Sequence, residues 1–445
     1  MNKRMVILGA GESGVGAAIL CRKAGFNVFV SDGGKIQDKY KQELATHEIE
    51  FEEGGHSEER ILGADEVMKS PGIPHKTGMV QKLIAAGITI TSEIELAYRF
   101  KENSKIIGIT GSNGKTTTTA LTYHICKEAG LDCALVGNIG ISIARQVALD
   151  PKPLYVAEIS SFQLDDIQTF RPDVAILTNI TEDHLDRYEY NFENYIRAKF
   201  NIVKNQNAAD SFIYCEDDPV TMKYLTHFPF ISNPLPFTMN REIPKGAFIT
   251  NNRMTVTGNE PLSMSIYDFA LKGKHNQYNT MAACLAATII GIRKEKIRDA
   301  VNTFESLEHR METVMTIRGV EFVNDSKATN VNSTWFALES MTRPVILILG
   351  GVDKGNDYSL IMDMVKEKVK AIVCLGKDNT KIHKAFGNEV EVMVNTDNAI
   401  DAVKASFHLA SKGDVVLLSP ACASFDLFSN YEDRGKQFKA AVKEL

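Results

Sequence analysis

Residues 108–117 read Gly-Ile-Thr-Gly-Ser-Asn-Gly-Lys-Thr-Thr, and more can be inferred from these ten residues than from any other part of the chain. The apolar residues 106–109 predict a short buried strand, and the residues from Thr117 to Gly130 predict a helix. A glycine-rich loop at a helix N-terminus can place its N–H groups around phosphate oxygens. Lys115 adds a point charge for these phosphates, and Thr116 offers a hydroxyl to Mg²⁺. The stretch therefore predicts a loop that binds nucleotide phosphates.

The spacing of the glycines differs from that of the usual P-loop. Only two residues separate Gly111 from Gly114, and Gly108 lies one residue too early to be the first glycine of the usual motif. We therefore interpret the loop as a shortened variant. A glycine-rich turn that binds no ligand is the alternative.

Length and composition limit the classes of protein that need to be considered. A chain of 445 residues is too long for one hydrophobic core and predicts roughly three domains. Its hydrophobic content of 44% and charged content of 24% are ordinary for a globular protein. The net charge of −6 makes nucleic acid an unsuitable partner, so any phosphate must be bound by local donors.

The seven cysteines form no Cys-x-x-Cys pair and no cluster with histidine, which favours reduced thiols in the core. The N-terminus leads directly into a predicted strand at 5–8, without a charged and then apolar leader. No apolar run approaches about 18 residues, the length needed to span a membrane. We expect a cytoplasmic protein without membrane insertion.

We predict an α/β protein of three domains. Residues 1–103 predict a Rossmann-like domain, and residues 104–308 a P-loop ATPase-like parallel sheet with a small antiparallel β addition. Residues 309–445 predict a second Rossmann-like α/β domain, with strands at 321–324, 345–349, 371–374 and 415–418. The proline-spaced residues 229–266 predict the antiparallel ribbon, and residues 278–291 predict a helix of small residues.

The first domain contains a second glycine-rich turn. Residues 9–14 read Gly-Ala-Gly-Glu-Ser-Gly after a predicted strand, and Asp32 ends the next strand, where an acid would meet a ribose. Taken alone, this pattern indicates an NAD enzyme. A uridine diphosphate would satisfy it equally, and tight packing without a ligand is the third alternative.

Polar residues follow two predicted strands of the second domain. Glu158 follows the strand at 154–157, and Glu182, Asp183 and His184 follow the strand at 174–177. Because the carboxyl ends of parallel strands share one edge of a sheet, these groups are well placed to bind metal or to orient a substrate.

Lys199 lies among apolar residues of a predicted helix over 192–204. The pattern alone favours a lysine whose stem is buried and whose ammonium reaches water. A buried amine with a partner is the alternative.

The third domain repeats the arrangement of polar loops after strands. Asp325 and Lys327 lie in one such loop and Lys354 in another, which suggests a second anionic substrate; solvated lysines are the alternative. Ser424 follows the last strand, where we expect a helix to start and to provide another anion-binding N-terminus.

Taken together, these motifs resemble those of the Mur ligases, ATP-dependent amide-forming enzymes of peptidoglycan synthesis to which folylpolyglutamate synthetase is related. The resemblance extends over all three domains and rests on residues 111–117, 158, 182–184, 275–279, 309–310 and 324–330. Residues 324–330 and 419–424 look like those of the branch that adds D-glutamate, and the Asp-Tyr-Ala-His loop of other branches is absent.

The resemblance implies an ATP-dependent ligase that joins UDP-N-acetylmuramoyl-L-alanine to D-glutamate through an acyl phosphate. ATP and Mg²⁺ are the implied cofactors, and we expect a monomer. The alternative within the resemblance is another Mur or folylpolyglutamate-type ligase with a different amino acid. Two other classes remain, an NAD-dependent oxidoreductase and a non-catalytic nucleotide-binding regulator, but neither explains all of these motifs.

The resemblance also implies roles for individual residues. The implied catalytic residues are Lys115, Glu158, His184, Lys199 and Lys327. The implied metal site consists of Thr116, Glu158, His184 and a carbamylated Lys199, which replaces the interpretation of Lys199 as a solvated lysine. The implied ATP site consists of Gly111, Ser112, Asn113, Gly114, Lys115, Thr116, Thr117, Asn276, Asn279, Arg310, Asp325 and Lys327. The other substrates would be bound by Glu12, Ser13, Asp32, Ser70, Gly72, Asn138, Ser160, Thr329, Lys354, Ser424, Phe425 and Tyr431.

Overall fold

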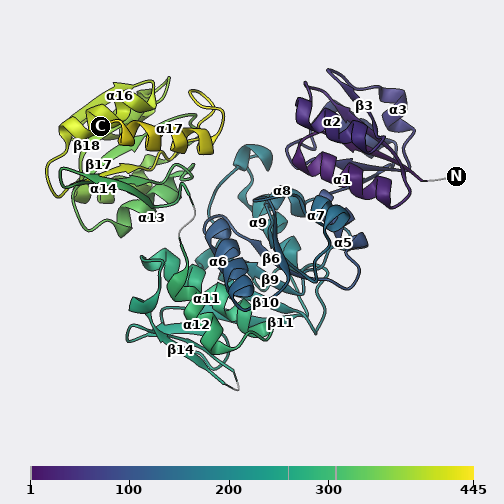
Figure 1. Ribbon diagram of the computed structural model, residues 1–445, viewed down its shortest axis with the longest axis horizontal. Coiled ribbons are helices and arrows are strands. Elements are labelled where there is room, and N and C mark those ends of the chain that lie inside the picture. Colours follow the sequence, from purple (N-terminus) through teal and green to yellow (C-terminus); the bar gives the residue numbers. More distant parts are fainter. Residues whose placement is uncertain (1–2, 259, 306–307) are drawn as a thin grey trace. The chain divides into compact units, whose positions relative to one another are not determined.

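The computed structural model describes residues 3–258, 260–305 and 308–445. It contains three sheets, each covered by helices (Figure 1). This α/β architecture is the predicted one. Each sheet lies within one of the three predicted domain ranges, whose boundaries stay predictions. The chain separates into two compact units, residues 1–270 with 278–304 and residues 271–277 with 305–445, and each unit is described by itself.

The first sheet is parallel, with strand order β3-β2-β1-β4-β5. Its strands are β1 (Arg4–Leu8), β2 (Asn27–Asp32), β3 (Glu50–Glu53), β4 (Glu66–Lys69) and β5 (Thr89–Thr91). Its helices are α1 (Glu12–Lys23), α2 (Asp38–Thr46), α3 (Glu58–Leu62), α4 (Gly78–Ala85) and α5 (Glu93–Phe100). Alternate residues of β1 enter different cores: Met5 and Ile7 pack with α1, and Val6 and Leu8 pack with α3 and α4.

The second sheet has the order β14-β13-β12-β11-β10-β9-β6-β8-β7. Its strands are β6 (Lys105–Thr110), β7 (Cys133–Gly137), β8 (Leu154–Glu158), β9 (Val174–Leu177), β10 (Ser211–Cys215), β11 (Asn233–Thr238), β12 (Ala247–Thr250), β13 (Arg253–Val256) and β14 (Leu262–Ser265). Its α-helices are α6 (Lys115–Glu128), α7 (Ile143–Leu149), α8 (Ser161–Leu164), α9 (Phe192–Phe200), α10 (Pro219–Tyr224), α11 (Lys274–Ile289) and α12 (Lys294–Thr303), with 3₁₀ turns η1 (Leu185–Arg187), η2 (Asn201–Val203) and η3 (Ile266–Asp268). The core of this sheet is continuous with that of the first, through buried residues of α1, α5 and α7.

The predicted antiparallel ribbon over 229–266 is only partly correct. Strands β12 to β14 are antiparallel, but β11 pairs in parallel with β10 and with β12 and so extends the main sheet. Pro234 and Pro236 suggested an irregular ribbon, yet they fall on alternate positions, so their missing N–H groups share one side of β11. That side carries few strand pairs, because β12 pairs only with Phe237 and Thr238.

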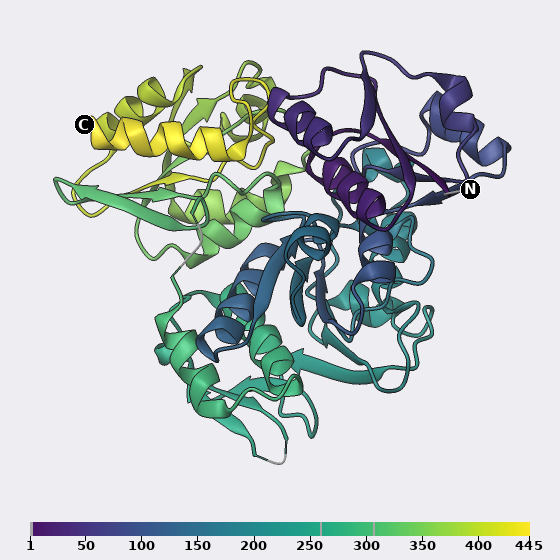
Figure 2. The ribbon, with the colours of Figure 1, turned by 45° about the vertical axis from the view of Figure 1, so that its right-hand side comes forward.

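The third sheet has the order β15-β16-β20-β17-β18-β19 and is parallel except for the β15/β16 hairpin. Its strands are β15 (Glu312–Ile317), β16 (Val320–Asn324), β17 (Val345–Leu349), β18 (Val369–Leu375), β19 (Val392–Thr396) and β20 (Val415–Leu418). Its helices are α13 (Val331–Ser340), η4 (Tyr358–Ile361), α14 (Met362–Lys368), α15 (Thr380–Phe386), α16 (Ala399–Leu409) and α17 (Tyr431–Lys443). Helices α13 and α14 cover one face, and α16 and the long yellow α17 cover the other (Figures 1 and 2).

One predicted feature of the core is confirmed and one helix start is wrong. All seven cysteines are buried and reduced, including Cys422. In the part of the chain that the structure describes, no helix combines the length and apolar character of a membrane span. The helix predicted to start near Ser424 begins instead at Tyr431, because Asn430 supplies the N-cap by accepting a hydrogen bond from Asp433 N.

Candidate active site

The loop after β6 has the form of a phosphate-binding loop. Gly114 is the N-cap of α6 with φ of +81°, so the helix starts at Lys115, two residues before the predicted start. This left-handed backbone suits glycine. The early start places Lys115 and the buried Thr116 in the first turn, where the N–H groups of a helix N-terminus and the helix dipole favour an anion.

The loop is braced from the carboxyl end of β9. Ser112 N donates to Asn179 O over 2.9 Å, and Asn113 N donates to Asn179 Oδ1 over 2.9 Å. The hydroxyl of Ser112 donates to Thr181 O over 2.9 Å. These contacts fix the backbone of the loop before any ligand arrives, which lowers the entropy that binding must overcome.

Two lysines contact the same loop. The ammonium of Lys115 donates to Gly111 O over 2.8 Å and to Ser112 O over 2.9 Å. Lys199, on α9, is only 1% exposed and donates to Gly111 O over 2.6 Å. Burial, and then the charge of Lys115, lower the pKa of Lys199 well below its usual 10.5. The prediction of a solvated lysine is therefore wrong, and the alternative, a buried amine with a partner, is confirmed.

Tyr195 is a site residue that sequence reasoning did not identify. Its hydroxyl lies 3.0 Å from Ser112 Oγ, and the Lys199 Nζ atom lies 4.4 Å from the centre of its ring. Tyr195 precedes Lys199 by one helical turn, so both side chains share the face of α9 that meets the loop. The one signal in the sequence was this spacing of one helical turn, and the same spacing is typical of an apolar helix face.

Glu158 ends β8 and is 1% exposed. Asn138 donates to it from its side chain, Nδ2 to Oε1 over 2.8 Å, and Asn138 N donates to Glu158 O over 2.8 Å. Two residues later, Ser160 forms a capping box with Gln163 at the start of α8. Glu158 also contributes to the electrostatic field at Lys199, so the carboxylate and the amine belong to one site.

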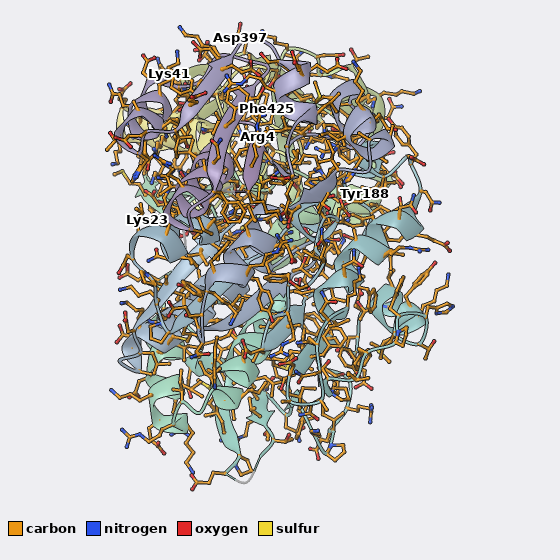
Figure 3. The ribbon with its side chains drawn as sticks, turned by 90° about the vertical axis from the view of Figure 1, so that its right-hand side faces the viewer. Arg4, Lys23, Lys41, Tyr188, Asp397 and Phe425 are labelled. Atoms are coloured by element: carbon orange, nitrogen blue, oxygen red, sulfur yellow. The ribbon has the colours of Figure 1, made fainter. Side chains whose placement is uncertain are left out.

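His184 lies in the loop after β9, as the N-cap of η1, with a left-handed backbone, φ of +53°. Its ring meets Phe162 edge-on at 5.2 Å, and its Nε2 atom lies 3.7 Å from Asp183 Oδ2. Left-handed backbone at a residue other than glycine is costly and is often found at functional sites. Tyr188, labelled in Figure 3, stacks on Phe162 from the same loop.

The residues around Lys199 fit a magnesium ion in their chemistry. Thr116 and Glu158 offer hard oxygen ligands, which Mg²⁺ prefers. Among the described residues, no three His, Cys, Asp or Glu side chains converge closely enough to hold a metal ion alone. Oxygens from a phosphate and from a modified Lys199 would complete such a site.

The glycine turn over 9–14 is closed by Asp32. The carboxylate accepts from Ala10 N over 2.7 Å and from Gly34 N over 2.8 Å. Its position at the end of β2 matches the prediction, but both oxygens already accept a backbone N–H. Asp32 thus holds two loops together at the edge where a nucleotide would bind.

Two further residues predicted to bind substrate lie on the first turn of α1. Glu12 accepts from Arg145 Nε over 2.7 Å and from Ser142 N over 3.2 Å, so it joins α1 to α7. Ser13 is half-buried beside it. After β4, Ser70 donates to Gly9 O over 3.4 Å, and Gly72 O accepts from Arg187 over 3.3 Å.

The predicted adenine and ribose residues divide between the two units. Asn279 belongs to the first, where its Oδ1 accepts from Thr118 Oγ1 over 3.2 Å, close to Gly114. Asn276 belongs to the second, where it donates to Lys272 O over 2.8 Å. Arg310 also belongs to the second unit. Desolvation, and then the charge of Arg310, lower the pKa of the half-buried His275 to about 4.

In the second unit, Asp325 is the buried acid at the end of β16. Ser419 Oγ donates to it over 2.9 Å and Met311 N over 3.3 Å. Burial raises the pKa of Asp325 to about 7, against the lowering effects of Ser419 and Arg310. This carboxyl can therefore exchange a proton near neutral pH.

The loops beside Asp325 carry the remaining predicted residues. The Lys327 ammonium lies 5.2 Å from the centre of the Tyr431 ring, and Thr329 N donates to Lys327 O over 2.9 Å. Ser424 is buried, and its carbonyl accepts from Phe428 N in a turn rather than at a helix start. Two predicted residues are exposed, Lys354 and Phe425, the latter at 71%.

Arg434 is the second residue that sequence reasoning missed. It is 1% exposed and lies on α17. Its guanidinium donates to Ser326 O over 2.8 Å, to Cys422 O over 3.1 Å and, more weakly, to Gly350 O over 3.5 Å. These acceptors lie in the loops after β16, β20 and β17, so one side chain connects all three loops. A single arginine in a helix gives no sequence signal of this.

Three family models match successive parts of this chain. A MurD N-terminal domain matches residues 4–79, a Mur ligase middle domain residues 109–287, and a Mur ligase glutamate ligase domain residues 309–422. The chain belongs to the Mur ligase family. It is an ATP-dependent ligase of peptidoglycan synthesis.

The relatives matched over full length carry one name, UDP-N-acetylmuramoylalanine–D-glutamate ligase. That of Christiangramia forsetii is 54% identical, with 100% of each chain covered. The enzyme of Bacteroides fragilis is 51% identical and that of Cytophaga hutchinsonii 49%, again with 100% of each chain covered.

Solved structures with similar folds are more distant in sequence. A pseudomurein peptide ligase type C from Methanothermus fervidus has a TM-score of 0.63 at 20% identity, with 100% of both chains covered. The UDP-N-acetylmuramate–alanine ligase of Thermotoga maritima has a TM-score of 0.63 at 15% identity, also with 100% of both chains covered. These similarities show the fold.

Proposed function

We propose that this ligase uses ATP and Mg²⁺ to join the L-alanine carboxylate of UDP-N-acetylmuramoyl-L-alanine to the amine of D-glutamate. The names of the full-length relatives support both substrates. The observation that carries the chemistry is the phosphate loop whose Gly111 carbonyl is contacted by Lys115 and by the buried Lys199, next to Glu158.

A carboxylate is a poor acyl donor because it would have to expel an oxide ion. Transfer of the γ-phosphoryl group of ATP to the carboxylate makes an acyl phosphate, from which phosphate leaves readily. The amine then attacks the acyl carbon, and the tetrahedral intermediate collapses to the amide and phosphate. Two anions must approach each other in the first step, so cations and N–H groups that stabilise the moving phosphoryl group determine the rate.

The first unit would supply that stabilisation. The Lys115 ammonium would leave Gly111 O and Ser112 O and, together with the N-terminus of α6, would hold the β- and γ-phosphates. Bound Mg²⁺ would neutralise phosphate charge, held by Thr116, Glu158, His184 and the modified Lys199. Asn138 and Ser160 would face the nucleotide-sugar substrate beside Glu158.

Lys199 has the environment that carbamylation needs. Its lowered pKa favours the neutral amine, whose lone pair attacks CO₂ to give the carbamate with release of one proton. The product replaces a neutral amine by an anion and offers two oxygen ligands. We expect partial rescue of Lys199→Ala by acetate or another short carboxylate.

The second unit would bind D-glutamate and part of the nucleotide. Thr329, Lys354, Ser424, Phe425 and Tyr431 would bind the amino acid. Asp325 and Lys327 would contact ATP with Arg310 and Asn276, and Asn279 of the first unit would contribute beside the loop.

Phosphate release measured with ATP, UDP-N-acetylmuramoyl-L-alanine and a panel of amino acids tests this proposal. We expect release with D-glutamate and little with L-glutamate, L-alanine or diaminopimelate. A preference for another amino acid would favour the alternative ligase, and turnover without ATP would contradict the class.

Lys115→Ala should lower the rate by ~10²–10³ with an unchanged circular dichroism spectrum. We also expect a monomer, which gel filtration measures, and a cytoplasmic location.

A further inference from the structure

The turn after β4, residues 70–73, is held from two sides by residues outside the first sheet. We call it the edge turn. Ser70 N donates to Leu8 O over 2.9 Å, and Ile73 N donates to Ser70 O over 3.0 Å, so the turn is tight and adjoins β1. Ser70 and Gly72 are two of the residues that the family resemblance implies for substrate binding, and we assign them to the nucleotide-sugar.

Arg187, in η1, holds the exposed side of the edge turn. Its Nη2 atom donates to Pro71 O over 3.0 Å and its Nη1 atom to Gly72 O over 3.3 Å. The guanidinium lies 4.4 Å from the centre of the Phe162 ring of α8. A planar cation that donates two bonds and stacks on a ring has little freedom to change orientation.

The same arginine is also fixed to the loop that carries His184. Arg187 N donates to His184 O over 3.0 Å. The loop takes left-handed backbone at His184, Glu189 and Tyr190, with φ of 53°, 56° and 55°. Such backbone persists only where surrounding contacts impose it. Movement of the edge turn would therefore be transmitted to His184 over three residues.

Asp166, shortly after α8, holds the opposite side of the edge turn. Its carboxylate lies 3.0 Å from Lys69 Nζ and 2.9 Å from His75 Nε2, the residues that flank the turn. Lys69 is 2% exposed and donates to Ile73 O over 3.1 Å. The turn is thus connected to both segments that carry Glu158 and His184.

We propose that Arg187 is a positioning residue, which holds the edge turn in register with His184 and Glu158 so that a bound nucleotide-sugar presents its carboxylate to the phosphate loop. This inference rests on the proposed function for the identity of the ligand. The contact between Arg187 and the edge turn does not depend on the identity of the ligand, because all of its atoms belong to the protein.

The first experiment needs no ligand. Hydrogen–deuterium exchange of the peptide that contains residues 70–73 is compared in the full-length wild type, Arg187→Ala and Arg187→Lys. We expect ~10-fold faster exchange in Arg187→Ala, because two charged hydrogen bonds to the turn are lost. Lysine keeps the charge but offers no planar pair of donors, so an intermediate rate is expected. Unchanged exchange would overturn the proposal.

The second experiment measures steady-state kinetics and UDP binding. Arg187→Ala should raise KM for UDP-N-acetylmuramoyl-L-alanine at least ~10-fold and KM for ATP less than ~2-fold, with partial recovery in Arg187→Lys. The matched control is Arg171→Ala, which removes a half-exposed arginine paired with Asp210, 3.3 Å away, without touching the turn. Asp166→Asn, which loosens the turn from its other side, should reproduce the KM pattern.

The outcomes separate the two proposals. Faster exchange with unchanged KM would make Arg187 merely structural and overturn the positioning role. Equal increases in the KM for UDP-N-acetylmuramoyl-L-alanine and in the KM for ATP would also overturn the positioning role. A wild type that releases no phosphate with these substrates would overturn the proposed function, and the exchange rates together with the Kd of UDP would still decide the role of Arg187.

Discussion

Lys115 and Lys199 donate to one acceptor, the carbonyl oxygen of Gly111, over 2.8 and 2.6 Å. One amine comes from the first turn of α6 and the other from α9, 84 positions later in the chain. Two ammonium ions this close repel each other in a site from which water is excluded. Burial, and then this repulsion, lower the pKa of the Lys199 amine, and the neutral form can still donate to the carbonyl.

We predict that Lys199→Met stabilises the protein at pH 7 while it abolishes turnover. The folded-state pKa of Lys199 lies below its unfolded value of 10.5, so the unfolded chain binds more protons and the free energy of unfolding falls as pH falls below 10.5. Methionine removes this term. Thermal unfolding at several pH values measures it, with the exposed Lys204→Met as control. A lower Tm for Lys199→Met at pH 7 would contradict the prediction.

Gly114→Ala should destabilise the protein more than Gly130→Ala, at the other end of α6. Both glycines have left-handed φ, +81° and +84°, so alanine costs about 1–2 kcal/mol of backbone strain at either position. A Cβ on Gly114 would also lie 2.3 Å from Asn279 Oδ1, whereas a Cβ on Gly130 would meet nothing within 4 Å. Denaturant unfolding measures the difference, which adding Asn279→Ala should reduce. Equal effects at the two glycines would be evidence against the contact.

Asp325→Asn should change how stability depends on pH. The pKa of Asp325 rises from 3.8 to about 7 in the fold, so the folded state binds more protons and the free energy of unfolding falls as pH rises from 4 to 7. Asparagine cannot ionise, so the variant gains stability relative to the wild type at pH 8 and not at pH 4. Thermal unfolding at both pH values tests this, with the exposed Asp363→Asn as control. A constant difference between variant and wild type across this range would refute the assignment.

Arg434→Lys should cost at least ~2 kcal/mol of unfolding free energy, although it conserves charge. A lysine cannot reach the carbonyl oxygens of Ser326, Cys422 and Gly350 together. Its ammonium would therefore be buried with N–H groups that have no hydrogen-bond acceptor. Chemical denaturation checks this, and the exposed Arg318→Lys should change stability by less than ~0.5 kcal/mol. If both lysine variants were equally stable, the role of Arg434 in connecting the three loops would have to be abandoned.

Strand positions were the most predictable part of the fold. The runs at 345–349 and 415–418 are buried on both faces of a parallel sheet, so they are continuously apolar and stand out in the sequence. Strands β15 and β19 were missed because they lie at the two edges of the third sheet, are only partly buried and include polar residues. Strand β11 was misjudged because its prolines lie along one side.

The glycine-rich loop, the α/β class and the polar residues after the strands could be predicted without a structure, because they depend on local spacing and on residue type. Which of these groups contact one another depends on tertiary packing. It buried Lys199 against Gly111, committed Asp32 to backbone N–H groups, and brought Arg187 to the turn at Pro71 and Gly72. Burial and long-range hydrogen bonds depend on how distant segments pack, and one helical pattern is compatible with either a solvated or a buried lysine.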